Sequence, residues 1–306
     1  MTATAPTIPV LDARNQDAIT PAQAEAFRQS GLMIIRNLVR GAGLSALRAE
    51  TLPLVERAVA GCDDPDYFYK DHEQTGTRTP YRVEYVVDKT AAAKALLAHP
   101  FILRSVEILQ GRNFIPTWDS MVFKNAGMGA AIPWHRDSGD QHGDPRWPIF
   151  NVDIYLDRAD QHNGVWGIPG SNRWSAQRAQ ATITELNAGM ATGVFSTAHG
   201  AVPVAMEPGD VLFHDILVLH GSAAVRSELR RVIYLEFRPG EIELACGPHV
   251  PGYLPRKQQV LAECLRRRSF PGETPFIYRP TGSFADFPTD APPTFRYPHH
   301  DWWRTA

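Results

Sequence analysis

The strongest constraint on the fold is a change in the spacing of apolar residues near Phe114. Before this point apolar residues recur at helical spacing, as from Leu44 to Val59. From Phe114 to Arg238, short apolar runs of strand length alternate with turns rich in glycine and proline. Many short strands divided by such turns are typical of an antiparallel barrel or jelly roll. The sequence therefore predicts a mainly β protein with flanking helices.

Helices are predicted on both sides of this β region. Thr20 can cap a helix that ends by Gly31, because Pro21 fits the first turn and Gln23 completes a capping box. Further helices are expected over 44–59, 91–110 and 257–268. With 306 residues the chain is near the upper limit for one hydrophobic core. We expect a single domain with a helical part (1–113), a β core (114–240) and a proline-rich C-terminal extension (241–306) that packs on the core.

The composition of the chain restricts which kinds of partner it can bind and which cellular compartment suits it. A formal net charge of −2 argues against a nucleic-acid partner held by bulk electrostatics. No apolar run is long enough to span a membrane, and the first residues lack the features of a signal peptide. Three cysteines at wide spacings indicate reduced thiols and a cytoplasmic setting. Oligomeric state is not predicted by these features.

Residues 207–238 read as a turn, a strand, a short break and a second strand. With a period of two, Arg231 in the second strand shares a face with Ile233, Leu235 and Phe237. An unpaired guanidinium on an apolar face would cost roughly 3–5 kcal/mol, so Arg231 needs an anion. A structural Asp or Glu and an anionic small molecule are equally good partners on this observation alone.

Upstream, His135 and Asp137 have the spacing that places two side chains on one side of a strand. With His220 they supply two imidazoles and one carboxylate, a set that leaves neighbouring positions open and is associated with non-haem Fe(II) oxygenases. His-x-Asp also occurs at His142 and His299, where a polar loop and the tail favour solvated side chains. His214 competes with His220, and the spacing to Arg231 favours His220.

The chain resembles the phytanoyl-CoA dioxygenase-like (PhyH) family of Fe(II)/2-oxoglutarate-dependent oxygenases. The resemblance runs in patches over residues 20–240. It rests on Gly31-Leu32-Met33-Ile34-Ile35-Arg36, Trp134-His135-Arg136-Asp137, Asn163-Gly164, Pro169-Gly170-Ser171, Pro208-Gly209-Asp210, His220-Gly221-Ser222 and Arg231. Family members often carry a histidine at the position of Asn172. The resemblance implies a double-stranded β-helix (jelly-roll, cupin-like) core.

The resemblance also implies a ligand set. Fe(II) would be held by His135, Asp137 and His220, and the far carboxylate of the co-substrate 2-oxoglutarate would pair with Arg231. Ser222 would add a hydroxyl contact and Lys124 a second positive charge. With O2, the co-substrate would yield succinate and CO2 while a small-molecule substrate is oxidised. Chlorinating relatives replace the carboxylate ligand, so Asp137 favours hydroxylation.

The substrate is predicted only coarsely. Asn151 and Asp153 lie on the polar face of a predicted strand, and such a face can line a ligand cavity. Tyr81 belongs to an aromatic, charged stretch that is either a substrate wall or an ordinary surface strand. A small, natural-product-like substrate is favoured over a CoA ester, because no adenine or pyrophosphate site is apparent. Desaturation, epimerisation and cyclisation use the same iron site as hydroxylation, so the sequence does not distinguish these reactions.

Two other classes stay open at this point. One is a cupin-type metalloenzyme that uses no 2-oxoglutarate. The other is a non-catalytic jelly-roll binding module whose histidines are core residues. Arg231 separates the first from the oxygenase, since a dicarboxylate co-substrate would give its charge a small-molecule partner. Replacing His135 by alanine separates the oxygenase from the binding module, because a binding module should keep its ligand affinity without the metal.

Overall fold

A computed structural model describes residues 7–71, 76–127, 129, 131–138, 147–190, 195–224, 228–250, 252–270, 272–287 and 292–297. Its strands form two sheets, the second of which carries two of the predicted metal ligands. The strands are β1 (Val10–Asp12), β2 (Leu32–Arg36), β3 (Tyr67–Asp71), β4 (Arg78–Glu84), β5 (Phe114–Lys124), β6 (Ile132–His135), β7 (Phe150–Tyr155), β8 (Val165–Gly167), β9 (Val202–Pro203), β10 (Val211–Asp215), β11 (His220–Ser222) and β12 (Arg230–Pro239). The helices are α1 (Pro21–Ser30), α2 (Gly41–Val59), α3 (Val86–Lys89), α4 (Ala91–Leu97), α5 (Pro100–Gln110), α6 (Ala176–Met190), α7 (Gly240–Cys246) and α8 (Tyr253–Arg267).

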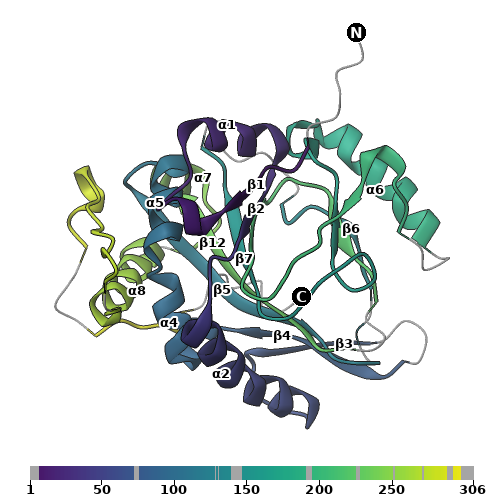
Figure 1. The fold of residues 1–306 in the computed structure, drawn as a ribbon, viewed down its shortest axis with the longest axis horizontal. Helices are drawn as coiled ribbons and strands as arrows, with labels where there is room; N and C mark the ends of the chain where they lie inside the picture. The colour runs from purple at the N-terminus through teal and green to yellow at the C-terminus, as the bar shows by residue number, and fades with distance from the viewer. Residues whose placement is uncertain are drawn as a thin grey trace.

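The larger sheet has eight strands in the order β1-β2-β10-β7-β12-β5-β4-β3. The smaller sheet has four, in the order β6-β11-β8-β9. In the middle of the large sheet, β2, β10, β7, β12 and β5 are neighbours without being consecutive in the sequence, because the chain passes back and forth between the two sheets. This is the double-stranded β-helix, or jelly-roll, core that the sequence predicted, with helices around it (Figure 1).

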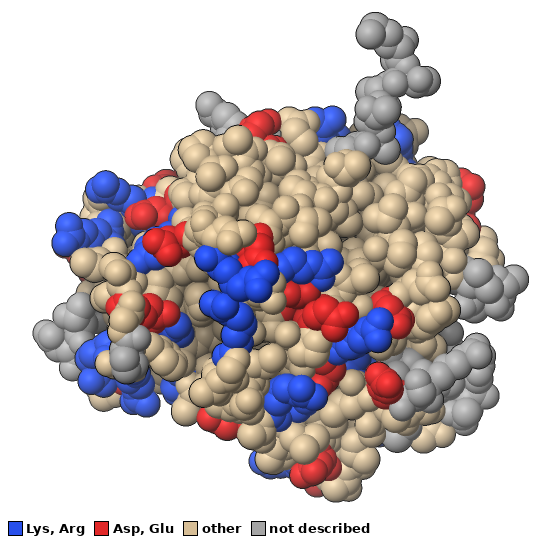
Figure 2. All heavy atoms as spheres, viewed as in Figure 1, with Lys and Arg blue, Asp and Glu red and all other residues tan. Residues whose placement is uncertain are grey.

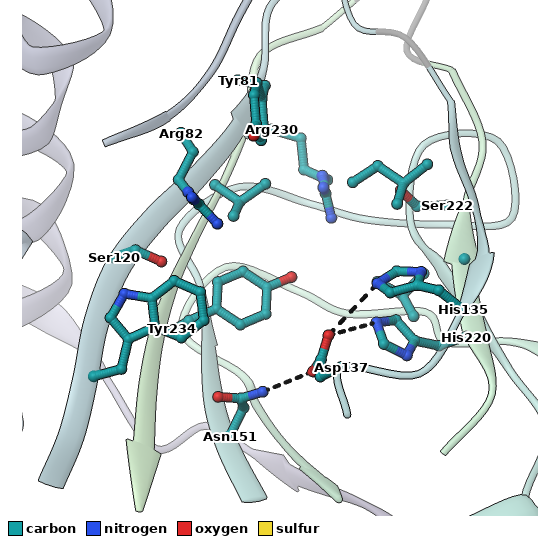
Figure 3. A pocket seen from close by; sticks show the side chains of 15 residues that line it. Tyr81, Arg82, Ser120, His135, Asp137, Asn151, His220, Ser222, Arg230 and Tyr234 are labelled. Atoms are coloured by element: carbon teal, nitrogen blue, oxygen red, sulfur yellow. Dashed lines mark hydrogen bonds and ion pairs between the residues drawn. The ribbon is translucent and has the colours of Figure 1, made fainter. Parts of the chain in front are cut away.

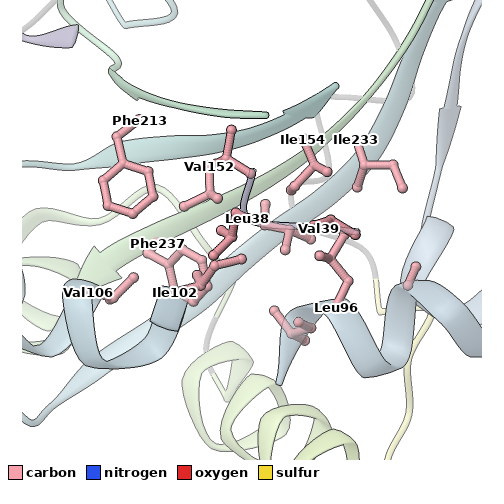
Figure 4. Close-up of a cluster of buried hydrophobic side chains, with 14 of the residues drawn as sticks. Leu38, Val39, Leu96, Ile102, Val106, Val152, Ile154, Phe213, Ile233 and Phe237 are labelled. Atoms are coloured by element: carbon pink, nitrogen blue, oxygen red, sulfur yellow. The ribbon is translucent and has the colours of Figure 1, made fainter. Parts of the chain in front are cut away.

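The hydrophobic core lies between the outer face of the large sheet and the helices (Figure 4). Phe213, Val152 and Ile233 project from β10, β7 and β12 and are fully buried. Ile102 and Leu96 meet them from α5 and α4. Because side chains alternate along a strand, the opposite face of the same strands is left to the interior of the jelly roll. That inner face carries the cavity described below.

Local sequence signals correspond to the observed helices. Thr20 and Gln23 form the predicted capping box at the start of α1. Residues 91–110 form two helices, α4 and α5, and the C-terminal helix runs from Tyr253 to Arg267. One expectation was wrong. Residues 176–190 form helix α6, where a continuous series of short strands was predicted.

Gly31 ends α1 in the left-handed conformation, with a φ of 72°. A Cβ atom here would lie 2.3 Å from a methyl group of Val218, in the loop between β10 and β11. Both the backbone conformation and this close approach require glycine. The amide of Asp215 also donates to the carbonyl of Gly31. The end of α1 is thereby attached to the loop that leads to His220.

The C-terminal part packs on β5 through buried polar contacts. The hydroxyl of Tyr253 in α8 donates to the carbonyl of Thr117. The ammonium of Lys257 lies 3.6 Å from a carboxylate oxygen of Asp119, and both side chains are buried. Since a buried charge is tolerated when it is paired, these contacts fix α8 against the strand.

The surface mixes both signs of charge. On the face shown in Figure 2, acidic and basic side chains are interspersed below a largely uncharged upper region. Among the described residues, no helix combines the length and apolar character needed to cross a membrane. The cysteines Cys62, Cys246 and Cys264 are all free thiols.

Candidate metal centre and its cavity

Two histidines on neighbouring strands form the centre of the site (Figure 3). His135 is the last residue of β6 and His220 the first of β11, and the antiparallel pairing places them directly opposite each other. Their ring centroids are 4.2 Å apart. Asp137 follows β6 by two residues, and its amide donates to the carbonyl of Ile216 at 3.0 Å. The predicted residues therefore converge on one point from separated parts of the chain.

The three side chains present one ligand atom each, and these atoms lie within 4.8 Å of one another. One oxygen of Asp137 is 3.5 Å from Nε2 of His135 and 3.7 Å from Nε2 of His220. His220 is buried, His135 is partly exposed and Asp137 opens to the cavity. This is the geometry of a mononuclear site with protein ligands on one side only.

Neighbouring groups orient the three ligands. Nδ1 of His135 lies 2.8 Å from the carbonyl of Pro133, and Nδ1 of His220 lies 3.1 Å from the carbonyl of Val218. A proton on each Nδ1 leaves each Nε2 with a free lone pair for a metal. The amide of Asn151 donates to the second oxygen of Asp137 at 3.0 Å.

Electrostatics keep Asp137 and His220 in their metal-binding forms. Burial would raise the pKa of Asp137, but its electrostatic interaction with the His220 ring and a hydrogen bond from His135 outweigh it and hold the pKa below its usual range. Burial, followed by repulsion from His135, lowers the pKa of His220 well below its ordinary value. An ionised carboxylate and a neutral imidazole are the forms that bind a metal.

A cavity of about 200 Å³ opens beside the triad. Its wall combines apolar residues with Tyr81, Arg82, Trp118, Ser120, Asn151, Ser222, Arg230 and Tyr234. Figure 3 shows the guanidinium of Arg230 pointing into this space from the side opposite Asp137. Arg230 is completely buried, and among the described residues its Nε and Nη1 have no hydrogen-bond partner. A buried cation with unused donors needs an anion.

The structure does not support the predicted role of Arg231. Its side chain does point to the apolar face, as the period of two required, but a structural carboxylate satisfies it. Nε and Nη2 each lie 2.9 Å from an oxygen of Asp157, and Nη1 donates to the carbonyl of Arg48 and the hydroxyl of Thr51. Arg231 thus joins β12 to α2, outside the cavity. The alternative of a structural partner is the correct one.

Lys124 and Ser222 form a unit at the edge of the cavity. The ammonium of Lys124 donates to the hydroxyl and carbonyl of Ser222 and to the carbonyl of Ala223. Burial, followed by repulsion from Arg230, lowers the pKa of Lys124 well below its ordinary value. Ser222 lines the cavity, whereas Lys124 is beside it with its donors in use. Lys124 therefore holds the end of β11 in place, and the predicted contact with a co-substrate is not supported.

The three predicted substrate contacts have different surroundings. Tyr81 lines the cavity, so the stretch around it is a wall of the site. Asn151 also lines the cavity, but its amide is directed to Asp137. Asp153 lies behind the wall, 3.4 Å from Nδ1 of His214, which contradicts a direct substrate contact. The other His-x-Asp motifs, at 142–144 and 299–301, lie outside the described residues.

Sequence reasoning missed Arg230, although a signal for it was present. Arg230 shares a strand face with Tyr234, and the polar side chains of β7 lie on the same side of the sheet. The polar face of a strand can line a cavity that binds polar ligands, so the alternation that placed Arg231 on the apolar side makes Arg230 a second candidate for the cavity.

A jelly roll that presents two imidazoles and one carboxylate beside a cavity defines the class of mononuclear non-haem metal oxygenases. Comparison with known proteins narrows the class. The profile of the phytanoyl-CoA dioxygenase (PhyH) family matches residues 27–233. No curated protein sequence matches the chain.

Several solved structures are similar. EvdMO1 is 27% identical with a TM-score of 0.58, over 71% of this chain and 49% of that one, so the match spans about half of EvdMO1. AviO1 from Streptomyces viridochromogenes Tue57 is 26% identical with a TM-score of 0.57, over 71% of this chain and 93% of that one. EctD from S. alaskensis with 2-oxoglutarate and 5-hydroxyectoine is 21% identical with a TM-score of 0.57, over 77% and 84%, and shows the shared fold.

The chain belongs to the phytanoyl-CoA dioxygenase (PhyH) family. It is an Fe(II)/2-oxoglutarate-dependent oxygenase, and its cofactors are Fe(II) and 2-oxoglutarate. The oxygenase hypothesis is therefore confirmed. It is favoured over the two alternatives, a cupin-type metalloenzyme without 2-oxoglutarate and a non-catalytic binding module. The side chains present fit these cofactors, because a three-ligand set faces the same cavity as a buried guanidinium that has unused donors within the described part of the chain.

Proposed function

We propose that this protein hydroxylates a small molecule at an Fe(II) held by His135, Asp137 and His220. Fe(II) with 2-oxoglutarate and O2 supplies the oxidising chemistry, and succinate and CO2 are released. Asp137 occupies the position of the carboxylate ligand, which favours hydroxylation over halogenation. We further propose that residues 1–306 act as a single domain, because α8 is fixed to β5 by buried polar contacts.

The observation that carries the proposal is the position of Arg230. Its guanidinium is completely buried, has unused donors among the described residues and shares a cavity with the triad. A planar fork of N–H donors suits a carboxylate, and a dicarboxylate bound to the metal at one end can reach such a group with the other. We assign Arg230 to the far carboxylate of 2-oxoglutarate.

The remaining wall residues bind and orient the substrate. Tyr81 and Trp118 provide aromatic surface, and the hydroxyl of Tyr234 is directed toward the triad in Figure 3. The cavity of about 200 Å³ suits a small molecule rather than a polymer. We propose a small natural product as substrate. Asn151 keeps one oxygen of Asp137 engaged, so that the other is directed toward the two imidazoles.

The test compares the two neighbouring arginines of β12. Arg230→Met should weaken 2-oxoglutarate binding by roughly 150- to 5,000-fold, the equivalent of a lost buried ion pair of about 3–5 kcal/mol. Arg231→Met removes the same charge one position away, on the other face of the strand, and is the matched control. Anaerobic calorimetric titration of the Fe(II)-loaded protein with 2-oxoglutarate measures both.

The expected result is a large loss of 2-oxoglutarate affinity in Arg230→Met and none in Arg231→Met. Metal binding should persist in both variants, since neither arginine belongs to the set of three ligands. Equal affinities in wild type and Arg230→Met would refute the assignment. Succinate formation from 2-oxoglutarate, measured with each of a panel of small molecules and with Fe(II) present or omitted, then tests the substrate class.

A further inference from the structure

A second buried histidine, His214, stands directly behind the metal centre. It lies on β10, on the inner face of the large sheet, and is 2% exposed. Its ring meets that of His220 edge-on, with centroids 4.2 Å apart and an interplanar angle of 77°. The three residues that can hold the metal do not include it. His214 therefore has no role in the function described so far.

The contact between the two rings joins specific nitrogen atoms. Nε2 of His214 lies 3.2 Å from Nδ1 of His220. Nε2 of His220 is the atom directed at Asp137, so Nδ1 carries the proton when Nε2 binds a metal. That N–H can donate to the carbonyl of Val218 or to His214, provided that Nε2 of His214 is unprotonated.

Asp153 stabilises this tautomer of His214. One of its carboxylate oxygens is 3.4 Å from Nδ1 of His214. Asp153 is 1% exposed, and among the described residues neither oxygen has a well-aligned hydrogen-bond partner. A buried carboxylate without a hydrogen-bond donor is costly. A proton on Nδ1 of His214 would supply such a donor to Asp153. His214 then faces His220 with an acceptor.

We propose that Asp153 and His214 are positioning residues that hold His220 in its metal-binding orientation. The carboxylate of Asp153 contacts Nδ1 of His214, and Nε2 of His214 contacts Nδ1 of His220, whose Nε2 would bind the metal. A hydrogen-bond acceptor behind a ligating histidine fixes its ring and raises the basicity of the ligating nitrogen. The inference rests on the proposed function, because it requires His220 to be a ligand.

The experiment uses Co(II) as probe, with binding and absorption spectrum measured on the full chain. His214→Phe keeps a ring but removes both nitrogens, and Asp153→Asn keeps the shape but removes the charge. His249→Phe is the matched control: its side chain is 4% exposed, against 3% for His214, and also contacts a carboxylate, that of Glu243. Loss of a partner behind a ligand typically weakens metal binding about 10–100-fold.

We expect His214→Phe to weaken Co(II) binding within that range and to alter the ligand-field spectrum. Asp153→Asn should change the Co(II) affinity and the spectrum in the same direction as His214→Phe, but by a smaller amount. His249→Phe should match wild type in both measurements. Wild-type affinity and spectrum in His214→Phe would overturn the inference. So would a complete loss of binding equal to that of His220→Ala, because His214 would then be a ligand itself.

Two further results keep the test decisive. Should His214→Phe fail to fold, Asp153→Asn decides alone, and an unchanged affinity and spectrum in it overturns the inference. His220→Ala separates this inference from the proposed function. Full Co(II) affinity in His220→Ala would overturn the assignment of the metal ligands, whereas loss there with no effect at His214 overturns only the positioning role.

Discussion

Replacing Arg231 by methionine should destabilise the protein while leaving 2-oxoglutarate binding intact. The guanidinium makes two 2.9 Å contacts with Asp157, and the Asp157 side chain is only 11% exposed. Removing one partner of a buried ion pair costs about 3–5 kcal/mol, because the other charge is left uncompensated. Arg48 lies 3.5 Å from the same carboxylate and is half exposed, so it can recover part of the loss.

We therefore expect a loss of stability near the lower end, about 3 kcal/mol. For a domain of this size, each kcal/mol lowers Tm by about 2 °C, which gives a decrease of about 6 °C. Thermal unfolding followed by circular dichroism measures this change. Combining Arg231→Met with Asp157→Asn should be less harmful than the sum of the two single changes, since the pair is removed together.

The refuting result concerns the ligand. A tenfold or larger rise in the Kd for 2-oxoglutarate in Arg231→Met, with Tm unchanged, would show that the cation serves the co-substrate. It would also remove the reason for assigning Arg230. A lower Tm with unchanged affinity supports the separation of the two arginines by strand face.

Three further outcomes are expected. Burial, opposed by the charge of Arg82, raises the pKa of Glu84 to about 7 from 4.5, so stability falls as pH rises between these values. Glu84→Gln should abolish this dependence, at most about 3 kcal/mol, in unfolding measured at pH 5 and 8. Asn151→Leu removes the donor to Asp137 and should weaken Co(II) binding about tenfold by titration; an unchanged affinity would show that this contact is dispensable. Gly31→Ala should lower Tm by several degrees, because the left-handed conformation alone costs about 1 kcal/mol or more and the added methyl collides with a neighbour.

The sequence alone determined the features that depend on local spacing. The change of period at Phe114 predicted an antiparallel barrel or jelly roll, the family resemblance favoured the jelly roll, and the capping box at Thr20 predicted the start of α1. The triad was also predicted from sequence: His135 and Asp137 lie two positions apart, and the family resemblance implied His220. Helix α6 was missed because it interrupts a region where turns and short apolar runs alternate.

Tertiary structure decided which of two adjacent arginines faces the ligand. Alternation along β12 places Arg230 and Arg231 on opposite faces, but it does not say which face encloses the cavity. That choice depends on the packing of α2 against the sheet, which brings Asp157, Thr51 and the carbonyl of Arg48 to Arg231. Partners that are up to 183 positions distant in sequence have no local signal. The same applies to His214, whose contact with Asp153 exists only because β10 and β7 are paired in one sheet.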